Sequence, residues 1–184
     1  MKLVLVTGWR AADLERLIDI AHRIEIWESH GREHISTSGE YTFYPPTADR
    51  LSALDAIQRE FESSLAGVPL HVEGSEITTI PFQTTNRPEA SEPLERKPAS
   101  IAIHCRGLTT QSQVLLRESA GRTYKENGTV AIERLPFAFG VEFCEAGYKK
   151  AFAVEQIPKH TTKDDVISYL GDDVIGEDAF RAMR

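Results

Sequence analysis

Side chains able to bind phosphate and a metal ion follow two apolar segments of the sequence. Thr7 directly follows the first segment, and Asp172 and Asp173 follow the second. If both segments are parallel strands, these residues lie beyond the carboxyl ends of the strands, where open α/β sheets bind ligands. Lys150 begins a helical run and supplies a cation that could reach the same edge. Since carboxylates hold a hard cation, and a hydroxyl and an ammonium bind phosphate oxygens, the set predicts a magnesium-dependent phosphate site.

Each of these features also has a common structural explanation. An Asp-Asp turn after a strand is more often a solvated loop than a metal site, and a Thr-Gly step is usually only a turn. His30 and His104 are by default partly buried, hydrogen-bonded histidines. Glu95 and Lys97 are by default an exposed charge pair worth less than about 1 kcal/mol. Spacing alone therefore indicates only an α/β domain.

The two ends of the chain carry the elements that would position this site. Continuous apolar runs at 2–6 and 166–170 predict strands covered on both faces. Helical periodicity at 11–23, followed by a short apolar strand at 24–29, makes the opening a βαβ unit. A further helix is predicted at 177–183.

The middle of the chain has a different, antiparallel character. Residues 34–46 are polar, and part of 67–98, where prolines recur, is expected to be loop. Thr47 is a candidate cap for a helix with its apolar positions at Leu54, Ile57, Phe61 and Leu65. The remaining predicted elements are a strand at 100–104, a helix at 109–126, and strands at 129–133 and 139–143. This pattern indicates a cap inserted into an α/β core.

The composition limits the classes to which the protein can belong. The 184 residues are 41% hydrophobic, enough for one ordinary domain or two small ones. The net charge of -7 is spread along the chain with no evident basic face, so we expect no nucleic-acid partner. No segment has the length of a signal peptide or a membrane span. Cys105 and Cys144 are expected to be reduced core thiols in a cytoplasmic protein.

Five segments of the sequence form an ordered set: VTGWRAADL, EIWESHGREH, ERKPASIAIHCRG, VEFCEAGYKKAFAV and YLGDDVIGEDAF. In this order they resemble trehalose-phosphate phosphatases of the haloacid dehalogenase superfamily, over nearly the whole chain. The most specific segments are ERKPASIAIHCRG, similar to the family's VErKpaslavHyRG, and GDDVIGEDAF, similar to its GDDxTDEDAF. SHGRE is similar to the family's SHGaE. The resemblance implies a haloacid-dehalogenase-like Rossmannoid α/β core with an inserted α/β cap.

The resemblance also implies roles for residues of the core. Thr7 matches the second superfamily motif, whose hydroxyl binds the transferring phosphate. Lys150 matches the third-motif lysine, which neutralises the charge on phosphate and nucleophile, with neighbouring Lys149 as the alternative. Asp172 matches the fourth-motif carboxylate that holds Mg²⁺, and Asp173 stands beside it.

A second group of matched residues is implied to recognise a sugar. The turn that joins core and cap is matched by His30, Gly31 and Glu33. The groups that hold the sugar hydroxyls and close the cap are matched by Glu95, Lys97 and Glu142. Arg106, together with His104, falls in the same segment, where strand support and ligand contact are both open. Carboxylates and a lysine suit a glucose disaccharide, since hydroxyls both donate and accept hydrogen bonds.

The sequence departs from the family pattern in two motifs. The first motif, DxDGT, is absent from the 184 residues, and it supplies the aspartate that is phosphorylated and the aspartate that acts as general acid and base. In the fourth motif, Gly176 stands where the family has aspartate and Ile175 where it has threonine. We therefore expect a core that is incomplete at both ends and a chain that is catalytically impaired as it stands.

Together these observations predict a core of residues 1–39 and 141–184 and a cap of residues 40–140. The activity implied by the family is hydrolysis of trehalose 6-phosphate to trehalose and phosphate, through an aspartyl-phosphate and with Mg²⁺. A non-catalytic module that binds a sugar phosphate is the first alternative. An unrelated nucleotide-binding domain is the second, although the sequence has no Gly-rich phosphate loop. The expected partner is a small-molecule sugar phosphate, with no membrane involved.

Overall fold

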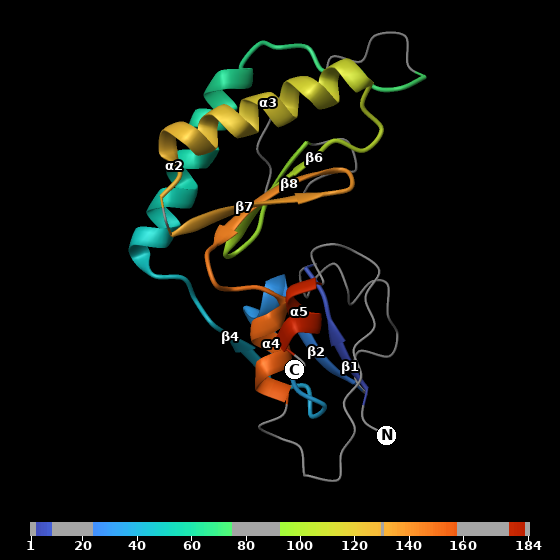
Figure 1. Cartoon of the computed structure of the whole chain (residues 1–184), viewed down its shortest axis with the longest axis vertical. Coiled ribbons are helices and arrows are strands. Elements are labelled where there is room, and N and C mark those ends of the chain that lie inside the picture. Colours follow the sequence, from blue (N-terminus) through green and yellow to red (C-terminus); the bar gives the residue numbers. More distant parts are fainter. Residues whose placement is uncertain (1–2, 9–23, 75–92, 130, 158–176, 183–184) are drawn as a thin grey trace. The chain divides into compact units, whose positions relative to one another are not determined.

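The computed structural model describes residues 3–8, 24–74, 93–129, 131–157 and 177–182 (Figure 1). The chain divides into two compact units. Unit 1 consists of Met1–Pro45 and Ala146–Arg184, and unit 2 consists of Pro46–Glu145.

Unit 1 contains a four-stranded sheet in the order β1-β2-β3-β4. Its strands are β1 (Val4–Val6), β2 (Glu25–Glu28), β3 (Glu33–Ile35) and β4 (Tyr41–Phe43). β1 pairs with β2 in parallel, as the predicted βαβ unit requires, and the other pairs are antiparallel. The helix predicted at 11–23 lies outside the described residues, as does the strand predicted at 166–170.

One prediction about this sheet is wrong, and one part of the sheet was not predicted. β1 is only half-buried and is preceded by Leu3, which is 55% exposed, so the described part of the strand is not covered on both faces. The polar segment 34–46, for which the sequence predicted no strand, contains β4 and most of β3. Its turn is closed by two backbone bonds, from the Ser36 N–H to the Glu40 carbonyl and from the Gly39 N–H to the Ser36 carbonyl, both 2.9 Å. A polar sequence with a Gly at φ +83° forms this hairpin because β2 supplies the apolar pairing partner.

Three short helical elements complete the described part of unit 1. They are the 3-10 turn η2 (Ser29–Gly31), α4 (Lys150–Gln156) and α5 (Glu177–Ala182). α4 packs against η2, β1 and α5. The ring of Phe152 on α4 meets Trp27 and Tyr44 edge-on, with centroids 6.3 and 5.8 Å away. The predicted helix at 177–183 is confirmed by α5.

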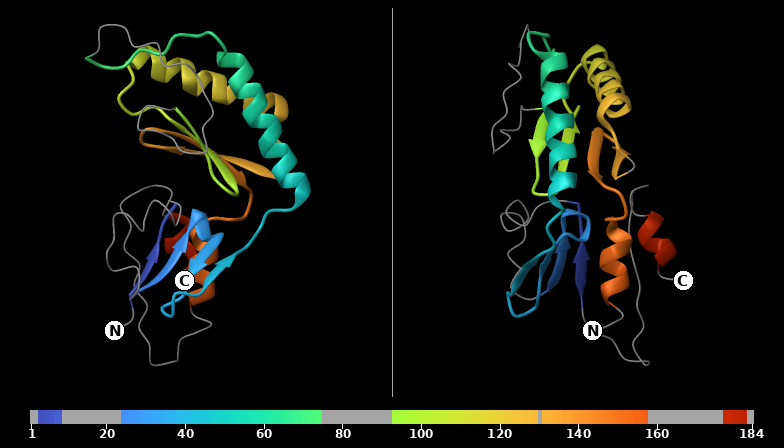
Figure 2. Two further views of the ribbon diagram at one scale, coloured as in Figure 1. Left: turned by 180° about the vertical axis from the view of Figure 1, so that it is seen from behind. Right: turned by 90° about the vertical axis from the view of Figure 1, so that its left-hand side faces the viewer.

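Unit 2 consists of an antiparallel sheet and two long helices. The strands are β5 (Leu94–Arg96), β6 (Ser100–His104), β7 (Ile132–Phe137) and β8 (Gly140–Glu145), in the spatial order β5-β6-β8-β7. The helices are α2 (Ala48–Leu65) and α3 (Thr110–Asn127), which lie side by side over one face of the sheet (Figure 2).

The core of unit 2 lies between these helices and the sheet. The predicted apolar positions of α2 are all buried there: Leu54, Ile57, Phe61 and Leu65. Burial of one such side chain contributes about 1.5–3 kcal/mol, so this stripe accounts for the position of the helix. Thr47 precedes α2 but makes no side-chain cap, whereas the Thr109 hydroxyl accepts a hydrogen bond from the Ser112 N–H at the start of α3.

Several sequence predictions can be compared directly with unit 2. The strand at 100–104 is confirmed by β6, and the helix at 109–126 by α3, within one residue at each end. The strand predicted at 129–133 instead runs from Ile132 to Phe137. It can include Pro136 because β7 is the edge strand of the sheet, where a proline is tolerated. β8 belongs wholly to unit 2, because it pairs with β6 on one side and β7 on the other. The unit therefore spans 46–145, where the sequence placed the cap at 40–140.

Both cysteines are free and buried, as predicted, and burial raises the pKa of the Cys105 thiol. Among the described helices, none has the length and apolarity needed to cross a membrane.

Candidate functional site

Polar side chains gather on the face of the unit 2 sheet opposite the helices. Glu95 pairs with Ala102 and Ala102 pairs with Glu142, so the three residues form one row across β5, β6 and β8. Residues in one row share a face, and alternation along β6 adds Ser100 and His104 to it. With Lys97, two residues beyond Glu95, these side chains form a set that we call the polar face: Glu95, Lys97, Ser100, His104 and Glu142.

Glu142 accepts two hydrogen bonds at a single carboxylate oxygen. Lys97 Nζ lies 3.1 Å from Glu142 Oε1, and the Ser100 hydroxyl donates to the same atom over 2.6 Å. The side chains of Lys97 and Glu142 are 8% and 5% exposed. Charge-assisted bonds of this kind fix the orientation of a carboxylate, and Glu142 is therefore held in one position on the sheet.

Glu95 is paired with the imidazole at the other end of the row. His104 Nε2 lies 2.9 Å from Glu95 Oε2, and the His104 ring meets Phe137 edge-on with centroids 5.7 Å apart. The His104 side chain is 40% exposed, against 11% for Glu95. The polar face is therefore most accessible at His104.

The structure brings Glu95, Lys97 and Glu142 together but places Arg106 differently. The Arg106 guanidinium lies over the Phe139 ring, 4.6 Å from its centroid, in the turn between β7 and β8. Ser100 is a member of the polar face that the motif comparison did not single out. Its position two and four residues before Ala102 and His104 was a usable signal, since strand alternation places all three on one face.

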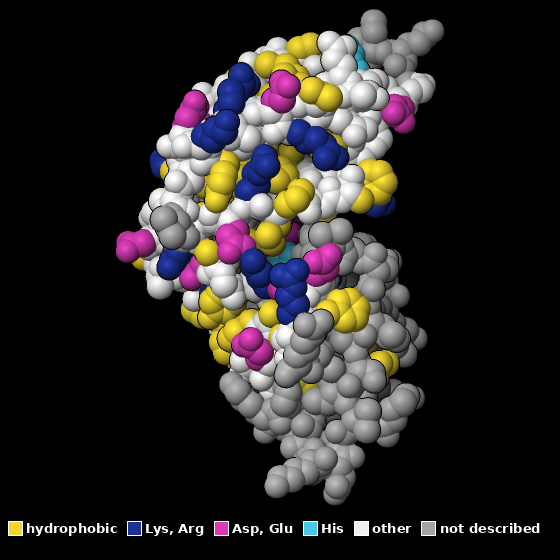
Figure 3. Space-filling model, in the orientation of Figure 1, with side chains coloured by type: hydrophobic (Ala, Val, Ile, Leu, Met, Phe, Trp, Pro, Cys, Tyr) yellow, Lys and Arg dark blue, Asp and Glu magenta, His cyan; other side chains and the backbone are white. Residues whose placement is uncertain are grey.

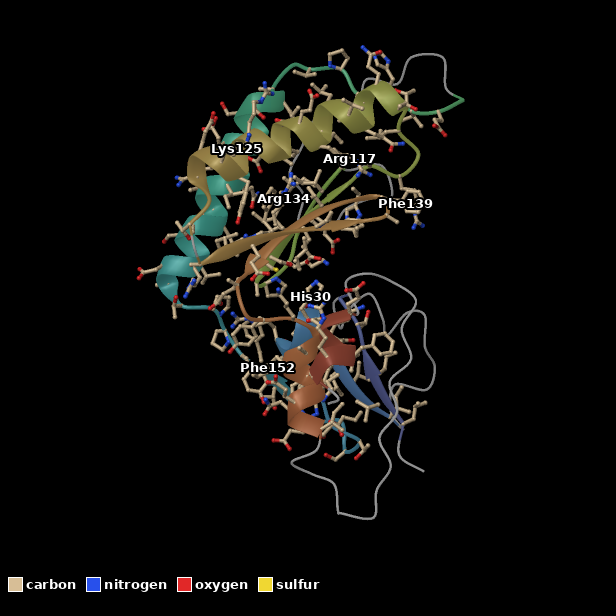
Figure 4. The ribbon with its side chains drawn as sticks, viewed as in Figure 1. His30, Arg117, Lys125, Arg134, Phe139 and Phe152 are labelled. Atoms are coloured by element: carbon tan, nitrogen blue, oxygen red, sulfur yellow. The ribbon has the colours of Figure 1, made fainter. Side chains whose placement is uncertain are left out.

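In unit 1, the end of β1 is joined to the turn that carries His30 and Gly31. The Thr7 N–H donates to the Trp27 carbonyl over 2.8 Å, and the His30 N–H donates to the Thr7 carbonyl over 3.3 Å. His30 is left-handed, with φ 59°, and is 4% exposed. A Cβ atom at Gly8 would lie 2.9 Å from His30 Cε1, so only glycine fits at that position without a shift. Thr7 and His30 are thus neighbours in the fold (Figure 4 labels His30).

Glu33 links the same turn to the β3–β4 hairpin. Its carboxylate accepts hydrogen bonds from the Tyr41 hydroxyl, at 2.8 Å, and from the Ser29 hydroxyl. Burial of the phenol and the adjacent Glu33 carboxylate raise the pKa of Tyr41 to about 12. Glu33 is 5% exposed, and the contacts shown here are structural.

Lys150 is the first residue of α4 and is half-buried, with Lys149 as the N-cap. The first turn of α4 is held by Asp178 of α5, whose carboxylate accepts from the Ala151 N–H at 3.2 Å and the Ala179 N–H at 2.9 Å. Since α4 also packs against β1, the fold brings the elements that carry Thr7 and Lys150 together. Asp178 was not singled out from the sequence, although it lies within the GDDVIGEDAF segment.

Solved structures were found that share this architecture. The C-terminal domain of trehalose-6-phosphate phosphatase from C. albicans matches with a TM-score of 0.67 and 18% identity, over 98% of this chain and 59% of its own. The chain has the fold of the trehalose-6-phosphate phosphatases. A trehalose-6-phosphate phosphatase related protein matches with a TM-score of 0.59 and 16% identity, over 97% of this chain and 65% of its own. The phosphatase from Aspergillus fumigatus matches with a TM-score of 0.54 and 16% identity, over 98% and 61%.

The likeness to these phosphatases confirms the predicted fold class, a haloacid-dehalogenase-like α/β core with an inserted α/β cap. This chain spans less than two thirds of the length of each of the three structures. No protein-family model matches the sequence, and no curated protein matches it.

Asp172 and Asp173, the residues predicted to hold Mg²⁺, lie outside the described residues. Within the described ranges, no group of three His, Cys, Asp or Glu side chains is arranged to hold a metal ion.

Proposed function

We propose that the chain binds a phosphorylated disaccharide of the trehalose 6-phosphate type, with its sugar hydroxyls on the polar face of unit 2. The observation that carries the proposal is the row Glu95–Ala102–Glu142, in which two carboxylates flank a small side chain. Sugar hydroxyls both donate and accept hydrogen bonds. The carboxylates of the polar face accept from hydroxyls and the Lys97 ammonium donates to hydroxyl oxygens, so the set suits a sugar. The likeness to trehalose-6-phosphate phosphatases supports the choice of substrate.

Unit 1 carries the residues that we propose to contact a phosphate group. The Thr7 hydroxyl donates to a phosphate oxygen, and the Lys150 ammonium neutralises part of the phosphate charge. His30 and Gly31 hold the turn beside Thr7, and the contact between His30 and Thr7 supports this positioning role. Asp172 and Asp173 remain the proposed ligands of Mg²⁺, and no step of the proposal depends on the ion.

The proposal assigns binding, and not turnover, to the chain of 184 residues. The sequence contains no DxDGT motif, so no described side chain takes the role of the phosphorylated aspartate. Hydrolysis of trehalose 6-phosphate is the second candidate function, and the fold shared with the phosphatases favours it. Release of phosphate from trehalose 6-phosphate, measured with and without Mg²⁺, separates the two candidates.

Titration calorimetry with trehalose 6-phosphate tests the binding. We expect Glu95→Gln and Glu142→Gln each to weaken binding by about tenfold, the effect of losing one charge-assisted hydrogen bond. Arg59→Gln is the matched control, because Arg59 is an exposed residue of α2 in the same unit. Titration with trehalose, which lacks the phosphate, should give weaker binding that remains sensitive to Glu95→Gln. Absence of binding by the unmodified chain, or equal affinities of all variants, would overturn the proposal.

A further inference from the structure

A basic stripe runs along the exposed side of α3. Arg117, Gly121 and Lys125 are spaced four residues apart and therefore lie one above the other on the helix. Arg134 of β7 reaches the middle of the stripe, since a Cβ atom at Gly121 would lie 3.4 Å from Arg134 Nη1. Arg117 donates to the Ala138 carbonyl in the β7–β8 turn over 3.3 Å. Figure 4 shows Arg117, Lys125 and Arg134 over α3 and β7.

Exposed apolar side chains accompany these cations. Val114 on α3 is 47% exposed and Phe139 in the β7–β8 turn is 45% exposed. Figure 3 shows basic and hydrophobic side chains interleaved over this part of unit 2. We call the set the α3–β7 face: Val114, Arg117, Lys125, Arg134, Pro136 and Phe139.

The cations of the α3–β7 face differ in what they contribute to the fold, since Arg117 is hydrogen-bonded to the β7–β8 turn. Within the part of the chain that the structure describes, neither Lys125 nor Arg134 takes part in an ion pair. Glu118 and Glu126 are the acidic residues of α3, and they follow Arg117 and Lys125 directly in the sequence. The helix also carries Gly121 in its interior, which costs about 0.5–1 kcal/mol relative to alanine, at the point where the Arg134 guanidinium approaches.

The face also contrasts with the rest of the chain. The net charge is -7, and the sequence shows no run of basic residues here. The cations become neighbours only through helical spacing and the approach of β7 to α3. Local positive charge on an acidic protein attracts anionic groups and raises their rate of encounter.

We propose that the α3–β7 face docks an acidic segment of a partner protein that carries an aromatic or aliphatic side chain. Charge complementarity selects the acidic groups, and Val114 and Phe139 offer the apolar contact. Arginine and aromatic side chains together are characteristic of protein–protein interfaces. A nucleic acid fits less well, because apolar side chains and Glu118 interrupt the cations, whereas a phosphate backbone requires a continuous series of them.

Fluorescence anisotropy with a short labelled peptide of repeated Glu-Glu-Phe-Glu units tests this proposal on the full chain. We expect saturable binding that weakens with rising salt, and about tenfold weaker binding by a Lys125→Gln, Arg134→Gln double variant. An Arg59→Gln, Arg181→Gln double variant is the matched control, since it removes the same charge from exposed positions on α2 and α5, outside the face. Phe139→Ala should also weaken binding.

Three results would overturn the proposal. They are no saturable binding of the peptide at low salt, equal loss of affinity in the control variant, and tighter binding of a single-stranded oligonucleotide of the same charge. A peptide with Gln in place of Glu should bind more weakly than the acidic peptide if charge complementarity operates. None of these measurements involves the polar face, so their outcome is independent of the sugar-binding proposal.

Discussion

Glu95 of β5 and Glu142 of β8 lie in one row of the unit 2 sheet, with Ala102 of β6 between them. Two strand spacings separate their backbones, which corresponds to about 10 Å. Each carboxylate is held by its own partner, Glu95 by His104 and Glu142 by Lys97. A ligand with hydroxyls that lies across β6 would reach both carboxylates, and the sugar-binding proposal depends on this relationship.

The ion pair between Lys97 and Glu142 should behave as a coupled unit in stability measurements. Glu142→Ala leaves the little-exposed Lys97 ammonium without this carboxylate, and we expect it to lower the free energy of unfolding by about 3 kcal/mol. A Lys97→Met, Glu142→Leu double variant should be closer to the unmodified chain than Glu142→Ala, because no charge is left unpaired. Urea denaturation gives the values.

An exposed pair provides the control for that measurement. Arg181 and Glu177 lie 3.2 Å apart on α5, with side chains 77% and 60% exposed. Arg181→Ala should lower the free energy of unfolding by less than about 0.5 kcal/mol. If the effects of Lys97→Met and Glu142→Leu, each measured alone, add up to the effect of the double variant, the pair is not coupled and this account of the polar face is wrong.

Gly31 is required by its conformation and by its neighbours. Its φ is +91°, and a Cβ atom there would lie 3.0 Å from Phe152 Cδ1 and 3.3 Å from the Ala153 nitrogen. We expect Gly31→Ala to lower the free energy of unfolding by about 3 kcal/mol, from backbone strain and overpacking together. Gly147, with φ +89° and nothing within 4 Å of its Cβ position, isolates the strain alone. Gly147→Ala should lower the free energy of unfolding by about 1 kcal/mol. Equal losses at the two positions would contradict a destabilising contact between α4 and the methyl group added at position 31.

The Tyr41 phenol should lose its proton only at high pH in a spectrophotometric titration. Its pKa is raised from 10.0 to about 12, and the neutral phenol is therefore favoured in the folded protein. The stabilisation that accompanies this shift is fully present below pH 10 and is lost as the pH rises towards 12. The difference between the titration curves of the unmodified chain and Tyr41→Phe should show one phenol with its midpoint near pH 12. A midpoint near pH 10 would contradict the hydrogen bond to Glu33.

The chain of 184 residues should release no phosphate from trehalose 6-phosphate above background. Thr7, Lys150 and Asp172 are retained, but the sequence has no DxDGT motif to form the aspartyl-phosphate. Inorganic phosphate is measured with and without Mg²⁺, and with Lys150→Ala as the control. Magnesium-dependent turnover that Lys150→Ala abolishes would show that another group takes the place of the nucleophile.

Elements with strong periodicity could be predicted from the sequence. The apolar stripe of α2 and the alternation of β6 are set by burial against a single core, so local pattern and tertiary structure agree. The β3–β4 hairpin was missed because its residues are largely polar and its pairing depends on β2, a partner supplied by the fold. The predicted bounds of β7 were wrong because a proline normally excludes a strand. The position of β7 at the end of the sheet, where a proline is tolerated, cannot be seen in the sequence.

Some residues of the candidate site could be predicted from the sequence, but their pairings could not. The resemblance singled out Glu95, Lys97 and Glu142, and the structure places them on one face. The pairing of Glu95 with His104 could not be predicted, because it depends on the register between the three-residue strand β5 and β6. Arg106 could not be placed either, since its contact with Phe139 is made in a turn.

A crystal structure of the chain with trehalose 6-phosphate tests the central claim most directly. The account predicts sugar hydroxyl oxygens within about 3 Å of carboxylate oxygens of both Glu95 and Glu142, with the ligand passing over Ala102. A ligand bound elsewhere, with neither Glu95 nor Glu142 in contact with it, would contradict the account.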